Sequence, residues 1–369
     1  MKFTTEKNEI VDALQMGASI AERRQTIPIL ANLRIVARDG KVEITATDLE
    51  IQIKTLTEVK KVVEEGEITV SARKMSELCR SLPDNEALEF DLNNGKLTVS
   101  SKNFHADFAT ISALDFPELE SKEETNSLSI SSSALQRLLN KTAFCMASQD
   151  VRYYLNGLLV EYKGGEVNAV ATDGHRLALA TSPLDKTITI DGERQILPRK
   201  AVLELSKILR QENEDIKITF GNSSLSIQDE NLDFSTKLID GKFPDYEKVI
   251  PKNISNTFSI NRKKFLESIN RISTISSEKS KAIKLNLNKD KITISANNIE
   301  EGGSGIEEIN VKYNGPSLDI GFNSGYLKEI INQLTLEEIT ILFSDSTAPT
   351  IIKDGSKDES LYVLMPMRV

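Results

Sequence analysis

The chain has 369 residues, of which 39% are hydrophobic and 27% charged, and its formal net charge is −9. This composition is typical of a globular protein of two or three domains, and no apolar run reaches the roughly 18 residues that a membrane span requires. If the excess of acidic residues were spread evenly, it would argue against nucleic-acid binding.

Targeting and redox signals are sparse. The opening residues, Met1-Lys2-Phe3-Thr4-Thr5-Glu6, lack the apolar stretch of a secretory signal. Cys79 and Cys145 lie far apart in helical patterns, and we expect them to pack as small apolar residues. No disulfide framework, cofactor motif or metal-ligand spacing is present. We therefore expect a cytoplasmic protein without a membrane anchor, a metal or a cofactor.

Along the chain, a short strand pattern is followed by a helical pattern six times. The strands are expected near residues 3–5, 68–71, 128–130, 195–197, 258–260 and 318–320. The helices are expected near residues 7–16, 72–82, 133–144, 199–211, 261–272 and 324–334. The remaining sequence alternates between apolar and polar residues, which is typical of strands.

One short motif recurs at a spacing of 125 residues. Its copies are Ala46-Thr47-Asp48-Leu49-Glu50, Ala171-Thr172-Asp173-Gly174-His175 and Ala296-Asn297-Asn298-Ile299-Glu300. Each copy follows two apolar runs separated by a turn, which is the pattern of a β-hairpin. The three thirds also end on similar strand patterns, at residues 108–110, 234–236 and 362–364. A period this long indicates tandem domains, because solenoid repeats run only about 20–50 residues. We expect an α+β protein with domains at residues 1–122, 123–250 and 251–369.

Charge is unevenly distributed between helices and the rest of the chain. The six helical windows contain 15 basic and 6 acidic residues, whereas the remainder contains 31 basic and 49 acidic residues. If equivalent helices share one surface, that surface is positive and can face phosphates, while the acidic exterior limits non-specific binding.

Several longer motifs now permit a family resemblance. The central block Gln149-Asp150-Val151-Arg152-Tyr153-Tyr154-Leu155-Asn156-Gly157, with residues 171–178 after it, resembles the bacterial β sliding clamp family, the β subunit of DNA polymerase III. So do Pro28-Ile29-Leu30, Phe243-Pro244-Asp245-Tyr246 and Met365-Pro366-Met367-Arg368. The resemblance runs over essentially the whole chain, in order.

The resemblance implies both a fold and a function. Each third would be a pseudo-twofold domain of two βαβββ halves, and two chains would join head to tail into a ring of six domains. Such a homodimer encircles duplex DNA without reading its sequence and tethers the replicative polymerase as a processivity factor. Its implied partners are the clamp loader, the DNA polymerase III α subunit and other proteins that carry a clamp-binding motif.

Residues expected to contact DNA come partly from the resemblance and partly from charge. Arg24, Gln149, Tyr153 and Tyr154 match family positions that contact DNA. Arg73, Arg152, Arg199 and Lys200 are chosen for their charge and helix placement. The two tyrosines could stack on bases or ribose, or one of them could belong to the core.

The resemblance also implies a groove for partner peptides between the second and third domains. Its matching residues are Leu155, Thr172, Gly174, His175, Arg176, Leu177, Pro244, Lys248, Val249, Val363, Leu364, Met365, Pro366, Met367 and Arg368. Aliphatic and methionine side chains suit leucine or phenylalanine anchors, and the arginines could receive peptide carbonyls or carboxylates. Lys248, Pro349 and Val369 depart from residues common in the family, so peptide preference could differ.

Ring closure requires complementary edges on the first and third domains. Lys74, Lys96, Lys102 and His105 make one candidate edge basic, while Glu300, Glu301, Glu307 and Glu308 make the other acidic. Phe108 and Ile275 align with apolar interface positions of the family and would be the buried anchors.

Two other functions remain as alternatives. The first is an adaptor that binds proteins without encircling DNA, which the basic helices disfavour. The second, more remote, is a hydrolase that uses His175 and Asp173, although no nucleophile or phosphate-loop motif accompanies them. We expect no catalytic residue.

Overall fold

The computed structural model describes residues 1–22, 27–119, 124–184, 192–209, 214–298, 302–355 and 359–368. Within these ranges the chain forms six α-helices and 25 β-strands. It divides into two compact units, one of residues 1–136 with 203–238 and the other of residues 137–202 with 239–369. None of the described helices is long and apolar enough to cross a membrane.

The same succession of one strand, one α-helix and three strands occurs six times along the chain. The first two copies are β1 (Lys2–Glu6), α1 (Lys7–Ile20), β2 (Asn32–Arg38), β3 (Lys41–Thr47), β4 (Ile51–Glu58), and β6 (Gly66–Ser71), α2 (Ala72–Ser81), β7 (Ala87–Asn93), β8 (Lys96–Ser101), β9 (Phe104–Ile111). A short additional strand, β5 (Lys61–Glu64), lies between them.

The middle and last thirds repeat the succession. The middle copies are β10 (Glu124–Ser131), α3 (Ser132–Thr142), β11 (Gly157–Lys163), β12 (Glu166–Thr172), β13 (Arg176–Pro183), and β14 (Arg194–Pro198), α4 (Arg199–Ile208), β15 (Asp215–Gly221), β16 (Ser224–Gln228), β17 (Leu232–Lys237). The last copies are β18 (Asn256–Asn261), α5 (Arg262–Ser273), β19 (Ala282–Asn288), β20 (Lys291–Asn298), β21 (Gly303–Asn310), and β22 (Leu318–Asn323), α6 (Ser324–Gln333), β23 (Glu338–Phe343), β24 (Thr350–Asp354), β25 (Ser360–Leu364). The βαβββ halves and all six helices expected from the sequence are confirmed.

Helices α5 and α6 begin at capping asparagines at the ends of the preceding strands. The Asn261 side chain accepts the Lys264 N–H at the start of α5, and the Asn323 side chain accepts the Gly325 and Tyr326 N–H groups at the start of α6. Such caps satisfy N–H groups that a helix leaves without partners. The capped helices then bury one apolar face, as α1 does with Ile10 and Leu14 against the sheet.

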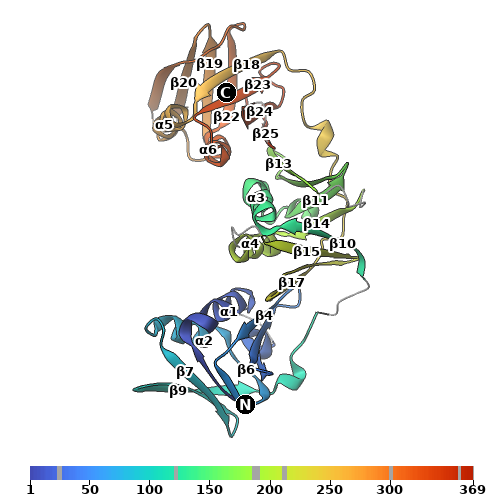
Figure 1. Cartoon of the computed structure of the whole chain (residues 1–369). Coiled ribbons are helices and arrows are strands. Elements are labelled where there is room, and N and C mark those ends of the chain that lie inside the picture. The colour runs from blue at the N-terminus through green and yellow to red at the C-terminus, as the bar shows by residue number, and fades with distance from the viewer. Residues whose placement is uncertain are drawn as a thin grey trace. The chain divides into compact units, whose positions relative to one another are not determined.

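In the first unit, 13 strands form one continuous antiparallel sheet, in the order β10-β15-β16-β17-β4-β3-β2-β6-β9-β8-β7-β1-β5. Helices α1 and α2 lie beside one another, with α1 packed on β3 and β4 (Figure 1). This sheet joins two different thirds of the chain, because β17 pairs with β4, with Phe234 opposite Ile53. We call this pairing the first junction.

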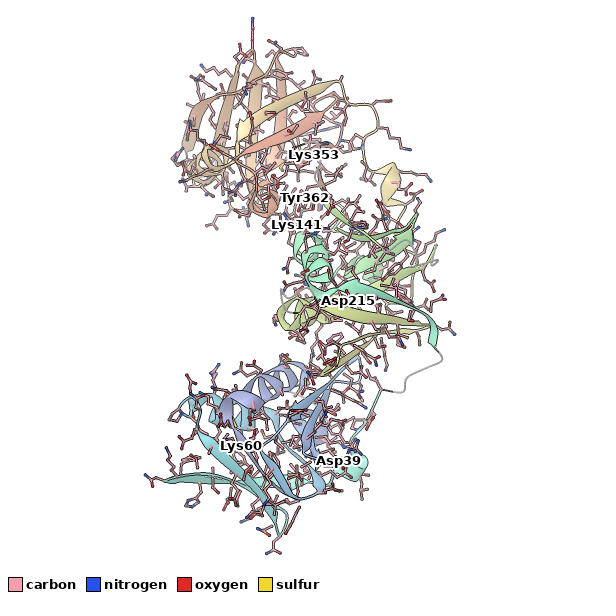
Figure 2. All side chains as sticks on the ribbon, viewed as in Figure 1. Asp39, Lys60, Lys141, Asp215, Lys353 and Tyr362 are labelled. Atoms are coloured by element: carbon pink, nitrogen blue, oxygen red, sulfur yellow. The ribbon has the colours of Figure 1, made fainter. Side chains whose placement is uncertain are left out.

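In the second unit, eight strands form a sheet in the order β14-β11-β12-β13-β25-β24-β23-β18, and four more form the sheet β21-β20-β19-β22. Helices α5 and α6 contact one another, and α5 also packs on β20 (Figure 1). Here β13 pairs with β25, with Ala178 opposite Tyr362, and we call this the second junction. Tyr362, labelled in Figure 2, is completely buried.

The recurring Ala-Thr-Asp motif has a structural cause. In the first copy, the Leu49 N–H donates to Thr47 Oγ1 (3.1 Å), while the Glu50 and Ile51 N–H groups donate to Asp48 Oδ1 (2.9 and 2.7 Å). In the second copy, the Gly174 N–H donates to Thr172 Oγ1 (3.1 Å), and the His175 and Arg176 N–H groups donate to Asp173 Oδ1 (2.9 and 3.0 Å). The motif therefore closes a hairpin turn, since its side chains satisfy the backbone groups that the turn leaves unpaired.

The closing strands of the three thirds are confirmed, but one part of their alignment is wrong. Strand pairing places Val99 opposite Ala106, Ile227 opposite Phe234 and Ile352 opposite Tyr362. Ala106, rather than Phe108, is therefore the structural counterpart of Phe234 and Tyr362. The Phe-Ala-Thr and Phe-Ser-Thr triplets are similar in sequence but are offset by two residues in the structure. Such a shift keeps each side chain on the same sheet face, so the sequence pattern alone does not reveal the offset.

Candidate partner patch and nucleic-acid interface

The second junction brings the chain's C-terminal tail onto the repeated turn. Leu177 lies opposite Val363 in the β13–β25 pair, and beyond the strand the Met365 N–H donates to the carbonyl of His175 (2.9 Å). The tail then reaches β22, where the Met367 N–H donates to the carbonyl of Gly321 (2.9 Å). Residues nearly 190 positions apart thus form one surface.

The apolar members of this surface form a floor and an exposed edge. Leu155, Leu177 and Val363 are at most 2% exposed and belong to one core cluster that also contains Phe243 and Tyr246. Above this floor, Val249 and Met365 are 39% and 38% exposed. We call this surface the partner patch; it comprises Leu155, Thr172, Gly174, His175, Leu177, Pro244, Lys248, Val249, Val363, Met365, Pro366, Met367 and Arg368. Exposed apolar side chains over a buried apolar floor are suited to receiving another protein's side chain.

Two residues expected in the groove lie on the other face of the sheet. Side chains alternate between the two faces of a strand, so those of Arg176 and Leu364 point to the opposite sheet face from those of Leu177 and Val363. The Arg176 side chain is 8% exposed, and its guanidinium lies between Phe144 and Tyr326, at 5.2 and 4.5 Å from their ring centres. It also pairs with Asp173 (3.1 Å) and with Glu329, and donates to the carbonyl of Phe144 (2.9 Å).

The Asp173–His175 neighbourhood is organised as a turn. Asp173 accepts the backbone N–H of His175, while the His175 imidazole stacks on the Tyr326 ring with 6.0 Å between centroids. A catalytic pair would require the carboxylate to orient a ring nitrogen of the histidine. The hydrogen bonds that Asp173 accepts are instead those of the residue that closes the hairpin turn.

The linker after β17 is anchored to the eight-stranded sheet. Tyr246 donates its hydroxyl hydrogen to Glu161, which also lies 3.4 Å from Arg194. Burial, together with the hydrogen bond to Glu161, raises the pKa of the Tyr246 phenol above its usual range. This anchor fixes the backbone that presents Lys248 and Val249 at the edge of the partner patch.

The candidate DNA loop, residues 149–154, borders the same surface. Asp150 accepts two hydrogen bonds from the Arg152 side chain (3.0 and 2.9 Å), which lower the pKa of this carboxyl to about 2. Arg152 also donates to the carbonyl of Asp173 (3.3 Å), so its guanidinium lies over Gly174. Tyr153 is 57% exposed, whereas Tyr154 packs partly against the core cluster. Of the two tyrosines, Tyr153 is the more exposed.

The other DNA candidates occupy helix starts. Arg73 is exposed in the first turn of α2 and pairs with Glu77 (2.7 Å). Arg199 begins α4 and donates to the carbonyl of Met146 (2.9 Å), with Lys200 next to it. Gln149 is exposed with a left-handed backbone (φ 57°). Arg24 lies outside the described residues.

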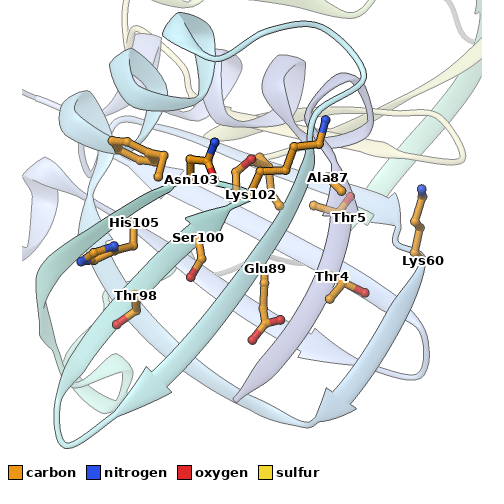
Figure 3. A pocket seen from close by; sticks show the side chains of 13 residues that line it. Thr4, Thr5, Lys60, Ala87, Glu89, Thr98, Ser100, Lys102, Asn103 and His105 are labelled. Atoms are coloured by element: carbon orange, nitrogen blue, oxygen red, sulfur yellow. The ribbon is translucent and has the colours of Figure 1, made fainter.

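The described candidate ring-closing residues lie on strands β8, β9 and β21, in the β8–β9 turn, and on or just after helices α2 and α5. Lys74, Lys96 and His105 are exposed, and Lys102 lies 3.8 Å from Glu86. Lys102 and His105 line a shallow hollow on the sheet surface that β1, β5, β7, β8 and β9 form (Figure 3). Glu307 is held by Arg271 (2.6 Å) and Glu308 by Lys291 (2.5 Å), so both carboxylates already have partners within the chain. Glu300 and Glu301 lie outside the described residues.

Phe108 and Ile275 are both half-buried. Phe108 points to the inner face of β9, and Ile275 lies beneath Gly303 and Gly305 of β21, 3.3 and 3.2 Å from where their Cβ atoms would be. Both cysteines are buried, as expected, and burial raises the pKa of Cys79 to about 12. Among the described residues, no group of three or more metal-ligating side chains is assembled.

Sequence reasoning missed the residues that surround Arg176. Tyr326 and Glu329 lie three positions apart on α6, and so share one helix face, but nothing in their local pattern indicates Arg176 as their partner. Phe144, from the segment after α3, was likewise not identified. Only the long-range pairing of β13 with β25 brings these groups together.

Comparison with known proteins identifies the family over the full length. Family models of the DNA polymerase III beta subunit match residues 1–120 (N-terminal domain), 129–245 (central domain) and 247–368 (C-terminal domain). The chain is 38% identical to the beta sliding clamp of Pseudomonas aeruginosa and 34% identical to that of Escherichia coli K12, covering 100% of both chains in each case.

Solved structures agree with the sequence relatives. A DnaN sliding clamp from Pseudomonas aeruginosa superposes with a TM-score of 0.96 at 37% identity, and the pol III beta of Caulobacter crescentus with 0.92 at 33%, each over 100% of both chains. With all three domain models matched and this repeated fold in place, the chain belongs to the DNA polymerase III beta subunit family, the beta sliding clamps.

Proposed function

We propose that two copies of this sliding clamp join head to tail into a ring that encircles duplex DNA, and that the partner patch tethers replication proteins to it. The observation that carries the ring is the repetition of the junctions. Strand β4 pairs with the closing strand β17, and β13 pairs with the closing strand β25. By the same rule, β21 pairs with the one closing strand that remains, β9.

Both of these strands offer an unpaired edge within the described parts of the chain. Strand β21 pairs only with β20, and the side of β9 that faces away from β8 is paired only at Thr110 and Ile111. One chain therefore supplies one edge of each kind, which is the condition for head-to-tail closure. Exposed edges are otherwise a liability that proteins cover or pair.

The junctions also fix the register of the proposed pair. Ile53 faces Phe234 and Ala178 faces Tyr362, and the hairpins make Gly305 the counterpart of Ile53 and Ala178. Gly305 of one copy would then lie opposite the second copy's Ala106, and Gly303 opposite its Phe108. Since Gly303 and Gly305 have no side chains, the Phe108 ring can lie over them against Ile275.

A ring of this kind explains the charge pattern. Basic residues concentrated on the helices would form many weak contacts to phosphates, which hold DNA without reading bases and allow sliding. The role is a structural one in the cytoplasm, that of a non-catalytic processivity factor without cofactor, built from three domains with boundaries near residues 122 and 250.

The partner patch supplies the second half of the proposal. Its buried floor of Leu155, Leu177 and Val363 suits leucine or phenylalanine anchors, and the exposed thioether of Met365 can adapt to either. The clamp loader and the polymerase α subunit are the partners that this function requires. Arg368 remains exposed and can receive a peptide carboxylate.

Retention on nicked circular DNA after loading by a cognate loader, followed by a high-salt wash, tests the proposal. We expect the protein to stay on circles and to leave once the DNA is cut, because a topological link survives salt and phosphate contacts do not. Release from circles and linear DNA alike, with a loader shown to load another clamp, would support an adaptor that does not encircle DNA.

A further inference from the structure

The first and second junctions have the same construction, but their apolar clusters are covered by different groups. Leu30 and Leu155 occupy equivalent positions and are 0% and 2% exposed, and Phe116 and Phe243 are 7% and 4% exposed. The two turns share the 3.1 Å hydrogen bond to the threonine hydroxyl.

The two turns differ in the residue that follows the aspartate. Leu49 has φ 73°, and its counterpart Gly174 has φ 89°. A leucine is disfavoured in this left-handed region, whereas glycine is not. The Leu49 side chain packs on the small cluster of Ile29, Leu30 and Phe116. The first junction therefore tolerates a strained backbone while an aliphatic side chain covers its apolar floor.

At the second junction, the place that corresponds to the Leu49 side chain is occupied by the Arg152 side chain, which a ligand can displace. The Arg152 guanidinium is 3.0 Å from where a Gly174 Cβ would be, and the Arg152 side chain is 47% exposed. It is held there by Asp150 and by the Asp173 carbonyl. An exposed ion pair of this kind contributes little stability, so a ligand can displace it.

We propose that the Leu49 side chain permanently occupies a position at the first junction that is open to a ligand at the second junction. There, the aliphatic anchor of a partner peptide occupies the equivalent position, above Gly174. The inference rests on the partner patch proposed above. It assigns leucine as the anchor of best fit, and it explains why a chain with two similar junctions would bind one peptide. Gln52 and Ser235 stand where the second junction has Leu177 and Val363, so an opened first junction would bind more weakly.

The test is a fluorescence anisotropy titration of a labelled peptide that carries leucine and phenylalanine anchors. The proteins compared are the native chain, Gly174→Leu, Leu49→Gly, the double variant, and Leu336→Gly as a control that removes a half-exposed leucine elsewhere. Thermal unfolding establishes that each variant is folded; glycine at position 49 suits the left-handed backbone.

We expect one peptide per native chain and at least tenfold weaker binding to Gly174→Leu, in which the introduced leucine fills the site. Leu49→Gly should add a second, weaker site, and the double variant should keep that weaker site alone. Full-strength binding to Gly174→Leu, or a folded double variant that binds no better than Gly174→Leu, would overturn the inference. A second site in Leu336→Gly would overturn it too, whereas no binding to the native chain would refute the partner patch itself.

Discussion

The guanidinium carbon of Arg176 lies 4.5 Å from the centre of the Tyr326 ring, and this contact joins the first residue of β13 to helix α6. The same guanidinium pairs with Glu329 of α6 and with Asp173 of the turn. Arg176 thus connects the repeated turn, the sheet of the second junction and the last helix through one buried side chain.

Replacing Arg176 with glutamine should lower the free energy of unfolding by about 2–4 kcal/mol, because a partly buried charge network loses its cation. Urea unfolding of the native chain and the variant measures this. Lys248→Gln, which removes the exposed pair with Asp245, should leave the urea midpoint essentially unchanged. Equal effects of the two substitutions would contradict the assignment of Arg176 as a connecting residue.

The two aspartates of the repeated turn should respond alike to substitution. Asp48→Ala and Asp173→Ala each remove two hydrogen bonds to backbone N–H groups, at an expected cost of about 1–3 kcal/mol. Urea unfolding checks both variants. If Asp173→Ala left stability unchanged while Asp48→Ala reduced it, the structural explanation of the repeat would be wrong for its second copy.

The Arg271–Glu307 pair predicts a pH dependence at the edge of β21. Hydrogen bonds from Arg271 and Ser268 lower the pKa of Glu307 from 4.5 to about 2. A depressed carboxyl pKa stabilises the folded state above the unfolded pKa, and the contribution is lost as pH falls from about 5 to about 2. At pH 7 the unfolding midpoint of the native chain should therefore be higher than that of Arg271→Gln, and the difference between the two midpoints should shrink below pH 5. A gap that stays constant down to pH 2 would contradict the pairing.

Ring closure should depend on Phe108. Phe108→Ala is expected to weaken dimerisation by about 2 kcal/mol, roughly thirtyfold, as truncation of a buried aromatic anchor does. Sedimentation equilibrium measures the dimer. The control is Leu114→Ala, because Leu114 is 88% exposed and lies outside the proposed interface; a comparable loss in that variant would argue against a specific role for Phe108.

Much of the fold follows from local sequence patterns. The repeated motif and the strand–helix alternation act over a few residues, so they predict three repeats and six strand–helix pairs directly, whereas the βαβββ halves were implied by the family resemblance. The pairing of β4 with β17 and of β13 with β25 joins residues more than 170 positions apart, and no local pattern encodes it.

The sequence predicted the site about as well as it predicted the fold. Leu155, Leu177 and Val363 do form one cluster, but Arg176 faces the other side of the sheet, because strand alternation separates neighbours that are adjacent in sequence. Arg152 was chosen for its charge, whereas its contacts with Asp150 and the Asp173 carbonyl depend on how the loop folds. The equivalence of Leu49 and Gly174 can be read from the 125-residue spacing, although its consequence requires the packing around each.

The most direct test of the ring is a disulfide placed in the proposed β9–β21 register. Asp107 and Ser304 are exposed and would lie directly opposite one another in two copies, within the distance that a disulfide spans. The double variant Asp107→Cys/Ser304→Cys, oxidised after loading onto nicked circular DNA, should remain on the circles in denaturing detergent and leave when the DNA is cut. Ala106→Cys/Ser304→Cys, whose side chains face opposite sides of the sheet, should not cross-link. If the first variant forms no cross-link between copies, or if cross-linked copies wash off intact circles, the chain does not close into a ring around DNA in this way.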